Sequence, residues 1–183
     1  MSMQCNFLHT HTKIPSYLPI KVTKANIGTC HHLAPKLGDH PDVAMALNNL
    51  AGTFVVLKKY EEGMDFYTKA LAICKKVDEI VLDHLSTAVT LNNMGSAHTH
   101  QGQHAQALEH YQKALKIYVK ADHPSMCLTH YAIAESYYEQ DMYSEAKDGY
   151  EKALALILAK VGADDPRNDR IKEKLQACKD KLE

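Results

Sequence analysis

Apolar and small residues recur in the same order three times along the chain. The segment YTKALAI, beginning at Tyr67, returns as YQKALKI from Tyr111 and as YEKALAL from Tyr150. In each copy the aromatic residue, the Ala three positions later and the aliphatic residue after it share one face of a helix. The pattern therefore predicts a helix in each copy, and the small residue marks a place where two helices pass closely: Ala70, Ala114 and Ala153.

A second periodic segment precedes each of these helices by 20 residues. It reads LNNLA from Leu47, LNNMG from Leu91 and HYAIA from His130. The unit is thus two helices joined by a short turn, and it occurs three times. Self-similarity at a nearly fixed period is typical of stacked helical repeats.

The small residues extend the pattern, since Ala51, Gly95 and Ala134 are each followed 12 positions later by Gly63, Ala107 and Ala146. This pattern resembles the tetratricopeptide repeat, a helix-turn-helix unit of about 34 residues. The longer unit and the LNN signature resemble the kinesin light chain variety of that repeat. The resemblance implies an all-α tetratricopeptide-repeat superhelix (a solenoid), and a non-catalytic scaffold or adaptor that binds proteins or peptides.

We expect an irregular, mobile leader over residues 1–38, because Pro15, Pro19 and Pro35 interrupt it and it shows no sustained period. Three helix pairs then follow over about 39–78, 79–121 and 122–162. The helices of the first pair are expected over 41–57 and 60–77, and those of the third pair over 124–140 and 143–161. In the second pair, the first helix is expected to start between residues 79 and 85 and to end at 101, and its partner to span 104–120. Pro41 and Pro124 each follow Asp-His and suit a first helical position.

A capping helix is expected over residues 163–183. Gly162 suits the end of the preceding helix, Asp165 an N-cap and Pro166 the first turn. An apolar stripe faces one side and charged residues the other, as a terminal cap requires: Ile171, Leu175, Cys178 and Leu182. The N-terminal end lacks such a cap, so the leader, another chain or further repeats would cover it.

Composition narrows the function classes. A net charge of −1 gives no general affinity for nucleic acid or for an acidic membrane surface. The five cysteines are scattered and form no CxxC pair, which favours a reduced, cytoplasmic setting. We see no signal peptide and no uninterrupted apolar stretch long enough to span a membrane.

Histidines and cysteines raise the question of a metal site. In the leader, Cys5, His9, His11, Cys30, His31 and His32 match no zinc-finger spacing. In the second unit, His98 and His104 match aromatic packing positions (Phe54 and Tyr60 in the first), so we interpret them as packing residues. With no phosphate loop, nucleophile elbow or HExxH motif, the sequence predicts no metal, no cofactor and no catalytic residue.

The resemblance places a peptide-binding groove along the first helix of each pair. The positions expected to face it are Asn48, Gly52, Val55, Asn92, Asn93, Ser96, Thr99, His100, Tyr131, Glu135, Tyr138 and Glu139. Asn can donate to and accept from a peptide backbone, and Tyr offers apolar area with a polar tip. Alternatively, the asparagines only bond neighbouring helices.

The groove positions also predict the ligand's charge. They include glutamates but no Lys or Arg, so we expect a neutral or basic protein or extended peptide with an apolar anchor. The carboxylate clamp of chaperone-binding relatives and the acidic cargo of kinesin light chain fit this groove poorly. A rival hypothesis is a structural module that forms a homodimer through its uncapped N-terminal face.

Overall fold

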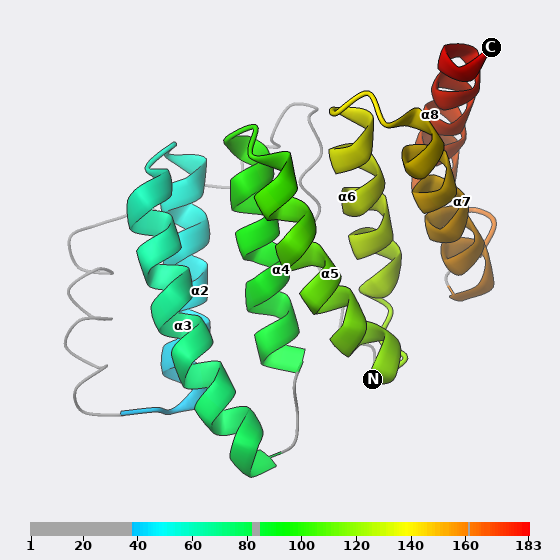
Figure 1. Cartoon of the computed structure of the whole chain (residues 1–183). Helices are drawn as coiled ribbons and strands as arrows, with labels where there is room; N and C mark the ends of the chain where they lie inside the picture. Colours follow the sequence, from blue (N-terminus) through cyan, green and yellow to red (C-terminus); the bar gives the residue numbers. More distant parts are fainter. Residues whose placement is uncertain (1–37, 82–84, 161) are drawn as a thin grey trace.

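The computed structural model describes residues 38–81, 85–160 and 162–183, and all regular structure in these ranges is helical. The helices are α2 (Pro41–Val56), α3 (Tyr60–Val81), α4 (Leu85–His100), α5 (His104–Lys120), α6 (Met126–Tyr138), α7 (Tyr143–Lys160) and α8 (Arg167–Leu182). The pairs α2/α3, α4/α5 and α6/α7, here called units one, two and three, follow one another in a row, and α8 packs on α7 at the far end (Figure 1). The predicted all-α array of three helix pairs and a final helix is confirmed, while the expected leader lies almost wholly outside the described residues.

The helix starts differ between units one and three. His40 accepts a hydrogen bond through Nδ1 from the Asp42 backbone N–H at 3.2 Å, and Pro41 takes the first helical position as predicted. In unit three the predicted start at Pro124 is two residues early, because Pro124 lies in a turn and α6 begins at Met126. The second helix of unit one, α3, also continues to Val81, past its expected end at residue 77.

A residue with positive φ joins the two helices of every unit. These residues are Lys58 (φ 60°), Gly102 (φ 71°) and Asp141 (φ 58°). The next residue donates its N–H to a carbonyl five positions back in each case, as Lys59 does to Phe54 at 2.9 Å. The glycine that the sequence shows in unit two therefore marks a left-handed turn that units one and three build from Lys and Asp.

The repeated small residues lie where the helices of a unit touch. Ala70, Ala114 and Ala153 are fully buried, which confirms the predicted close passage. A Cβ added at Gly95 would lie 2.7 Å from the Tyr111 ring, and one at Gly149 would lie 2.8 Å from Cβ of Ala134. Cores of this kind have no room for an additional methyl group.

In unit two His98 takes the place of an aromatic ring, as predicted, and His110, which was not predicted to do so, takes the place of a second. The Phe54 and Phe66 rings of unit one stack with centroids 5.2 Å apart. The matching rings of unit two, His98 and His110, are 5.1 Å apart, and His98 Nδ1 lies 2.7 Å from Oε1 of Gln103. The imidazoles therefore act as packing groups with a hydrogen bond at the turn.

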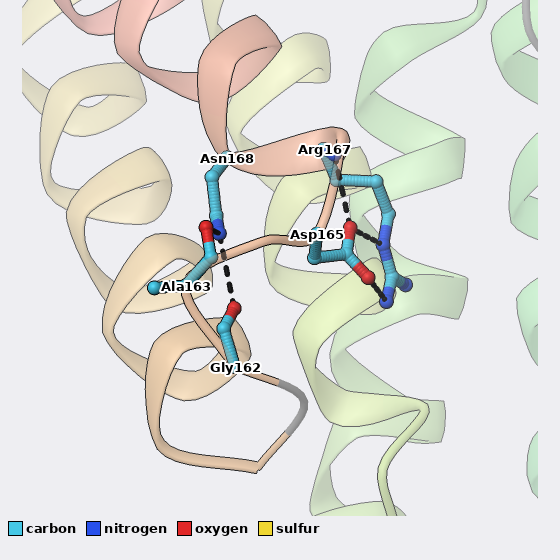
Figure 2. Close-up of polar contacts among 5 residues, drawn as sticks. All are labelled: Gly162, Ala163, Asp165, Arg167 and Asn168. Atoms are coloured by element: carbon cyan, nitrogen blue, oxygen red, sulfur yellow. Dashed lines mark hydrogen bonds and ion pairs between the residues drawn. The ribbon is translucent and has the colours of Figure 1, made fainter.

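The final helix is anchored by the loop that precedes it. The Asp165 carboxylate accepts from the Arg167 backbone N–H at 2.9 Å and pairs with the Arg167 guanidinium at 2.7 Å (Figure 2). Asn168, 1% exposed, donates through Nδ2 to the carbonyls of Gly162 and Ala163 at 3.1 and 2.9 Å. Asp165 therefore holds the start of α8 through the Arg167 N–H, although the N-cap residue is Pro166, one position later than predicted.

Three of the four residues expected to form the apolar stripe on α8 meet unit three, whereas Leu182 is 52% exposed and does not. Ile171 and Cys178 are buried in a core cluster with residues of α6 and α7, and Leu175 packs against it. Gly162 has φ 120° and donates its N–H to the Ile157 carbonyl at 3.0 Å, which confirms that it ends α7. α8 therefore closes the array on the side of unit three.

Candidate binding face of the first helices

The helix α8 occupies the place that a fourth first helix would take. Thr90 of α4 and Thr129 of α6 are buried against the preceding unit, and 39 residues beyond Thr129 the equivalent residue of α8, Asn168, is buried in the same way. The helices α2, α4, α6 and α8 thus share one register. We call the side of α2, α4 and α6 that points away from α3, α5 and α7, together with the matching side of α8, the first-helix face.

Three rows of residues cross the first-helix face, with one residue from each helix except that the aliphatic row has none on α8. The aliphatic row is Met45, Val89 and Leu128, the amide row is Asn48, Asn92, Tyr131 and Arg170, and the third row is Gly52, Ser96, Glu135 and Lys174. Met45 is 60% exposed and Val89 39% exposed. The amide-row and third-row residues are half-buried.

Hydrogen bonds link the amide row to neighbouring helices. Asn93 donates through Nδ2 to Oδ1 of Asn48 at 3.2 Å, which joins α4 to α2. The Thr129 hydroxyl donates to Oδ1 of Asn92 at 3.0 Å, which joins α6 to α4. The asparagines therefore do bond neighbouring helices, while the amide nitrogens of Asn48 and Asn92 have no hydrogen-bond partner among the described residues.

The third unit carries an ion pair that changes the expected charge of the face. The Glu135 carboxylate lies 3.1 Å from Nζ of Lys174 on α8 and accepts a hydrogen bond from the Tyr150 hydroxyl. The prediction that the face lacks Lys and Arg is wrong, because α8 brings two cations to it. Glu135 is thereby neutralised, and of the two glutamates only Glu139, which is exposed, forms no ion pair within the described residues.

The cations of α8 also lie over aromatic rings of α6. The Arg170 guanidinium is 5.4 Å from the centre of the Tyr131 ring, and Lys174 Nζ is 4.8 Å from that of Tyr138. The Tyr131 hydroxyl is buried, and burial, with the nearby Glu135 carboxylate, raises the pKa of Tyr131 to about 12. Within the described residues Arg170 forms no ion pair.

The repeated tyrosines of the second helices reach through to this face, a contribution that the sequence did not reveal. The Tyr111 hydroxyl lies 3.2 Å from Oγ1 of Thr99, and that of Tyr150 bonds Glu135. The Tyr67 hydroxyl would lie 3.4 Å from a Cβ at Gly52. Burial raises the pKa of Tyr67 to about 12, and burial is also the main reason why the pKa of Tyr150 is raised.

One predicted groove residue is misplaced. Val55 is 8% exposed and belongs to the core of unit one, since its Cγ2 lies 3.0 Å from where a Cβ at Gly63 would stand. The prediction that its side chain lines the groove is therefore wrong. The structure leaves the remaining predicted residues at least partly exposed, with His100 and Glu139 the most open: Asn48, Asn92, Asn93, Ser96, Thr99, His100, Tyr131, Glu135, Tyr138 and Glu139.

The aliphatic row was missed, although the sequence carries its signal. Met45 lies one helical turn before Asn48, and the repeat spacings of 44 and 39 residues carry it to Val89 and then to Leu128. Each position is aliphatic. The same spacing carries Tyr131 to Arg170 and Glu135 to Lys174, which identifies the two cations.

Metal binding finds no geometric support in the described part of the chain. In residues 38–81, 85–160 and 162–183, no three His, Cys, Asp or Glu side chains come together as ligands. The leader histidines and cysteines lie outside these ranges. None of the described helices combines the length and apolarity needed to cross a bilayer.

A repeat array of helix pairs is thus the class that the fold defines. Family models of the tetratricopeptide repeat match residues 43–77 and 83–159, together more than half of the chain. The chain belongs to the tetratricopeptide repeat family, and its repeats resemble those of kinesin light chain. Both models describe the repeat, and neither describes an enzyme.

Solved structures share the fold at low sequence identity. A putative kinesin light chain with nearly identical TPR-like repeats from Podosopora anserina is 18% identical, with 87% of this chain and 76% of that chain covered and a TM-score of 0.71. BtubC (BKLC) from P. vanneervenii is 18% identical over 78% of this chain and 58% of its own, with a TM-score of 0.68. The first TPR of Spaghetti (RPAP3), solved with the HSP90 peptide SRMEEVD, is 20% identical over 76% and 92%, with a TM-score of 0.56.

These likenesses show the fold alone. The chain spans little more than half of BtubC. No curated protein sequence matches the chain.

Proposed function

We propose that the protein is a non-catalytic scaffold that holds an extended peptide segment of a partner protein across its first-helix face. The observation that carries the proposal is the amide row. Asn48 and Asn92 are fixed through their oxygens by neighbouring helices, which leaves their amide nitrogens as pre-oriented donors for the carbonyls of a peptide backbone. The Spaghetti domain solved with an HSP90 peptide supports the same use of this fold.

The charge pattern refines the expected ligand. Because Lys174 neutralises Glu135, the face has no acidic bias at this position. Of the expected neutral or basic ligand, the basic alternative now rests on Glu139 alone. Arg170, which no carboxylate pairs within the described residues, favours a carboxylate at the α8 end. The ligand we propose therefore has an apolar body, which suits the aliphatic row, and a carboxylate at its α8 end.

Selection from a displayed peptide library, followed by titration with point variants, tests this function. Asn92→Ala removes one donor and should weaken selected peptides about tenfold, as expected for a lost interfacial hydrogen bond. Asn49→Ala is the matched control, since Asn49 is exposed on α2 outside the amide row. Equal loss in both variants, or no loss in either, would place the ligand elsewhere.

A second candidate is self-association through the open side of α2. Thr90 of α4 and Thr129 of α6 are 1% exposed because the preceding unit covers them, whereas nothing described covers the matching side of α2. Val56 and Leu57 there are 60% and 53% exposed. Sedimentation at rising concentration tests this candidate: a dimer that Val56→Glu dissociates would support it, and a monomer throughout would reject it.

A further inference from the structure

The spacing of the first helices determines the conformation and side-chain pattern of the segment that can lie across them. α2 contacts α4, and α4 contacts α6. Helices in contact lie about 8–10 Å apart. The aliphatic row therefore offers one apolar contact at each such step, from Met45 to Val89 to Leu128, beside the donors of the amide row.

Only some extended conformations present a side chain at this interval. A polyproline II segment rises about 3.1 Å per residue with three residues per turn, so every third side chain points the same way at steps of about 9 Å. A β-strand presents side chains on one side at steps of about 7 Å. A spacing of about 8–10 Å fits the first conformation and falls out of step with the second.

The backbone chemistry of the two conformations differs in the same direction. A polyproline II segment makes no internal hydrogen bonds, so its carbonyls are open to donors. The amide nitrogens of Asn48 and Asn92 lie beside the aliphatic row and have no hydrogen-bond partner within the described residues. Each can donate to one carbonyl per step without a neighbouring strand to complete a sheet.

Charge fixes the direction of the segment. The repeat spacing carries Leu128 to Arg167 of α8, whose guanidinium is already paired with Asp165. Arg170, one helical turn further along α8, lies over the Tyr131 ring and has no carboxylate partner within the described residues. An acidic group one step beyond the last aliphatic side chain would pair with this guanidinium, whereas Lys174 is already engaged by Glu135.

We infer that the first-helix face takes a polyproline II segment with aliphatic side chains at every third position and a carboxylate three residues after the last of them. This inference rests on the proposed function and goes beyond it, since it specifies the ligand's conformation, period and orientation. The aliphatic side chains contact Met45, Val89 and Leu128, and the carboxylate meets Arg170.

Three peptides of equal composition test the period. LPPLPPLPPD spaces its leucines by three, LPLPLPPPPD by two and LPPPLPPPLD by four, while proline keeps all three extended. Fluorescence polarisation should show the first binding the full chain about tenfold more tightly than the others, because only it matches the leucine interval and places its Asp three residues after the last leucine. Equal affinities, or no binding of the first peptide at millimolar concentration, would overturn the inference.

Variants place the contact. Met45→Glu with Val89→Glu should weaken the first peptide at least about tenfold. Val119→Glu with Leu158→Glu, at exposed aliphatic positions of α5 and α7, is the matched control and should leave its affinity unchanged. Arg170→Glu should reverse the preference between LPPLPPLPPD and LPPLPPLPPK, and an unchanged preference would reject the orientation.

The two proposals fail separately. If library-selected peptides bind in a manner that depends on Asn92 but show no period of three, the proposed function stands and this inference is wrong. If no library peptide depends on Asn92, the proposed function fails, whatever the proline-rich peptides do.

Discussion

Replacing Gly149 by Ala tests whether the close contact between α6 and α7 is a steric requirement. Gly149 holds the position that Phe66 has in unit one and His110 in unit two, and its lack of a side chain lets α7 approach α6 more closely. The added Cβ would lie 2.8 Å from Cβ of Ala134 and 3.3 Å from its Cα. These atoms belong to or adjoin the backbone, so relief requires the two helices to separate.

The magnitude follows from two opposing terms. Overpacking of this kind costs about 1–3 kcal/mol, whereas Gly→Ala within a helix gains about 1 kcal/mol. Because the contact of 2.8 Å is with atoms joined to the backbone, we place the overpacking cost in the upper part of its range, at about 2–3 kcal/mol. The net destabilisation is then about 1–2 kcal/mol, with a melting temperature lowered by about 2–4 °C for each kcal/mol in a chain of this size.

Gly52→Ala is the matched control within the same fold. Its Cβ would meet only the Tyr67 hydroxyl oxygen at 3.4 Å, an ordinary contact. The helix-propensity gain of up to about 1 kcal/mol should then raise the melting temperature. Thermal melts followed by circular dichroism measure both variants, and a Gly149→Ala chain as stable as wild type would refute the steric reasoning.

Three further predictions concern packing, turns and pH. Ala114→Leu, at a fully buried contact, should destabilise the fold by about 1–3 kcal/mol in urea unfolding, whereas Ala105→Leu, at an exposed site, should change it little; equal effects would show the register to be wrong. Lys58→Gly should raise the melting temperature, because φ is 60° at this position and Gly adopts a positive φ without strain. Gly102→Lys should lower the melting temperature, through a loss of about 1–2 kcal/mol in the free energy of unfolding. Shifts of the same sign in the two variants would contradict this. Because burial raises the pKa of Tyr67 from 10.0 to about 12, the folded state holds the phenol proton more tightly than the unfolded state does. The contribution of Tyr67 to stability is therefore constant below pH 10 and falls as the pH rises towards about 12. Tyr67→Phe should reduce that fall in unfolding curves measured across this range, and an unchanged fall would disprove the assignment.

The fold was predictable because the repeat supplies each signal three times. The burial of Ala70, Ala114 and Ala153 and the packing role of His98 follow from comparing units, where a local pattern in one copy checks the others. Helix ends were less predictable. Pro124 follows the same Asp-His pair as Pro41, yet it lies in a turn, because hydrogen bonds between residues three apart, such as Met126 N–H to the His123 carbonyl, precede the helix there.

The site was only partly predictable, because its contacts join different helices. The burial of Val55 depends on Gly63, a glycine of the next helix, and periodicity on one helix does not reveal it. The charge of Glu135 depends on Lys174, 39 residues further along, on a helix whose polar side was interpreted only as a solvent-facing cap. Extending the repeat register into α8 would have found Lys174 and Arg170.

Mapping amide chemical shifts while a selected peptide is titrated tests most directly whether the ligand lies across the first helices. The account predicts shifts concentrated in α2, α4 and α6, around the Asn48 and Asn92 side-chain amides and the Arg170 guanidinium. The second helices α3, α5 and α7 should change little on their outer sides. Shifts confined to those outer sides, or to the open side of α2 around Val56, would contradict it.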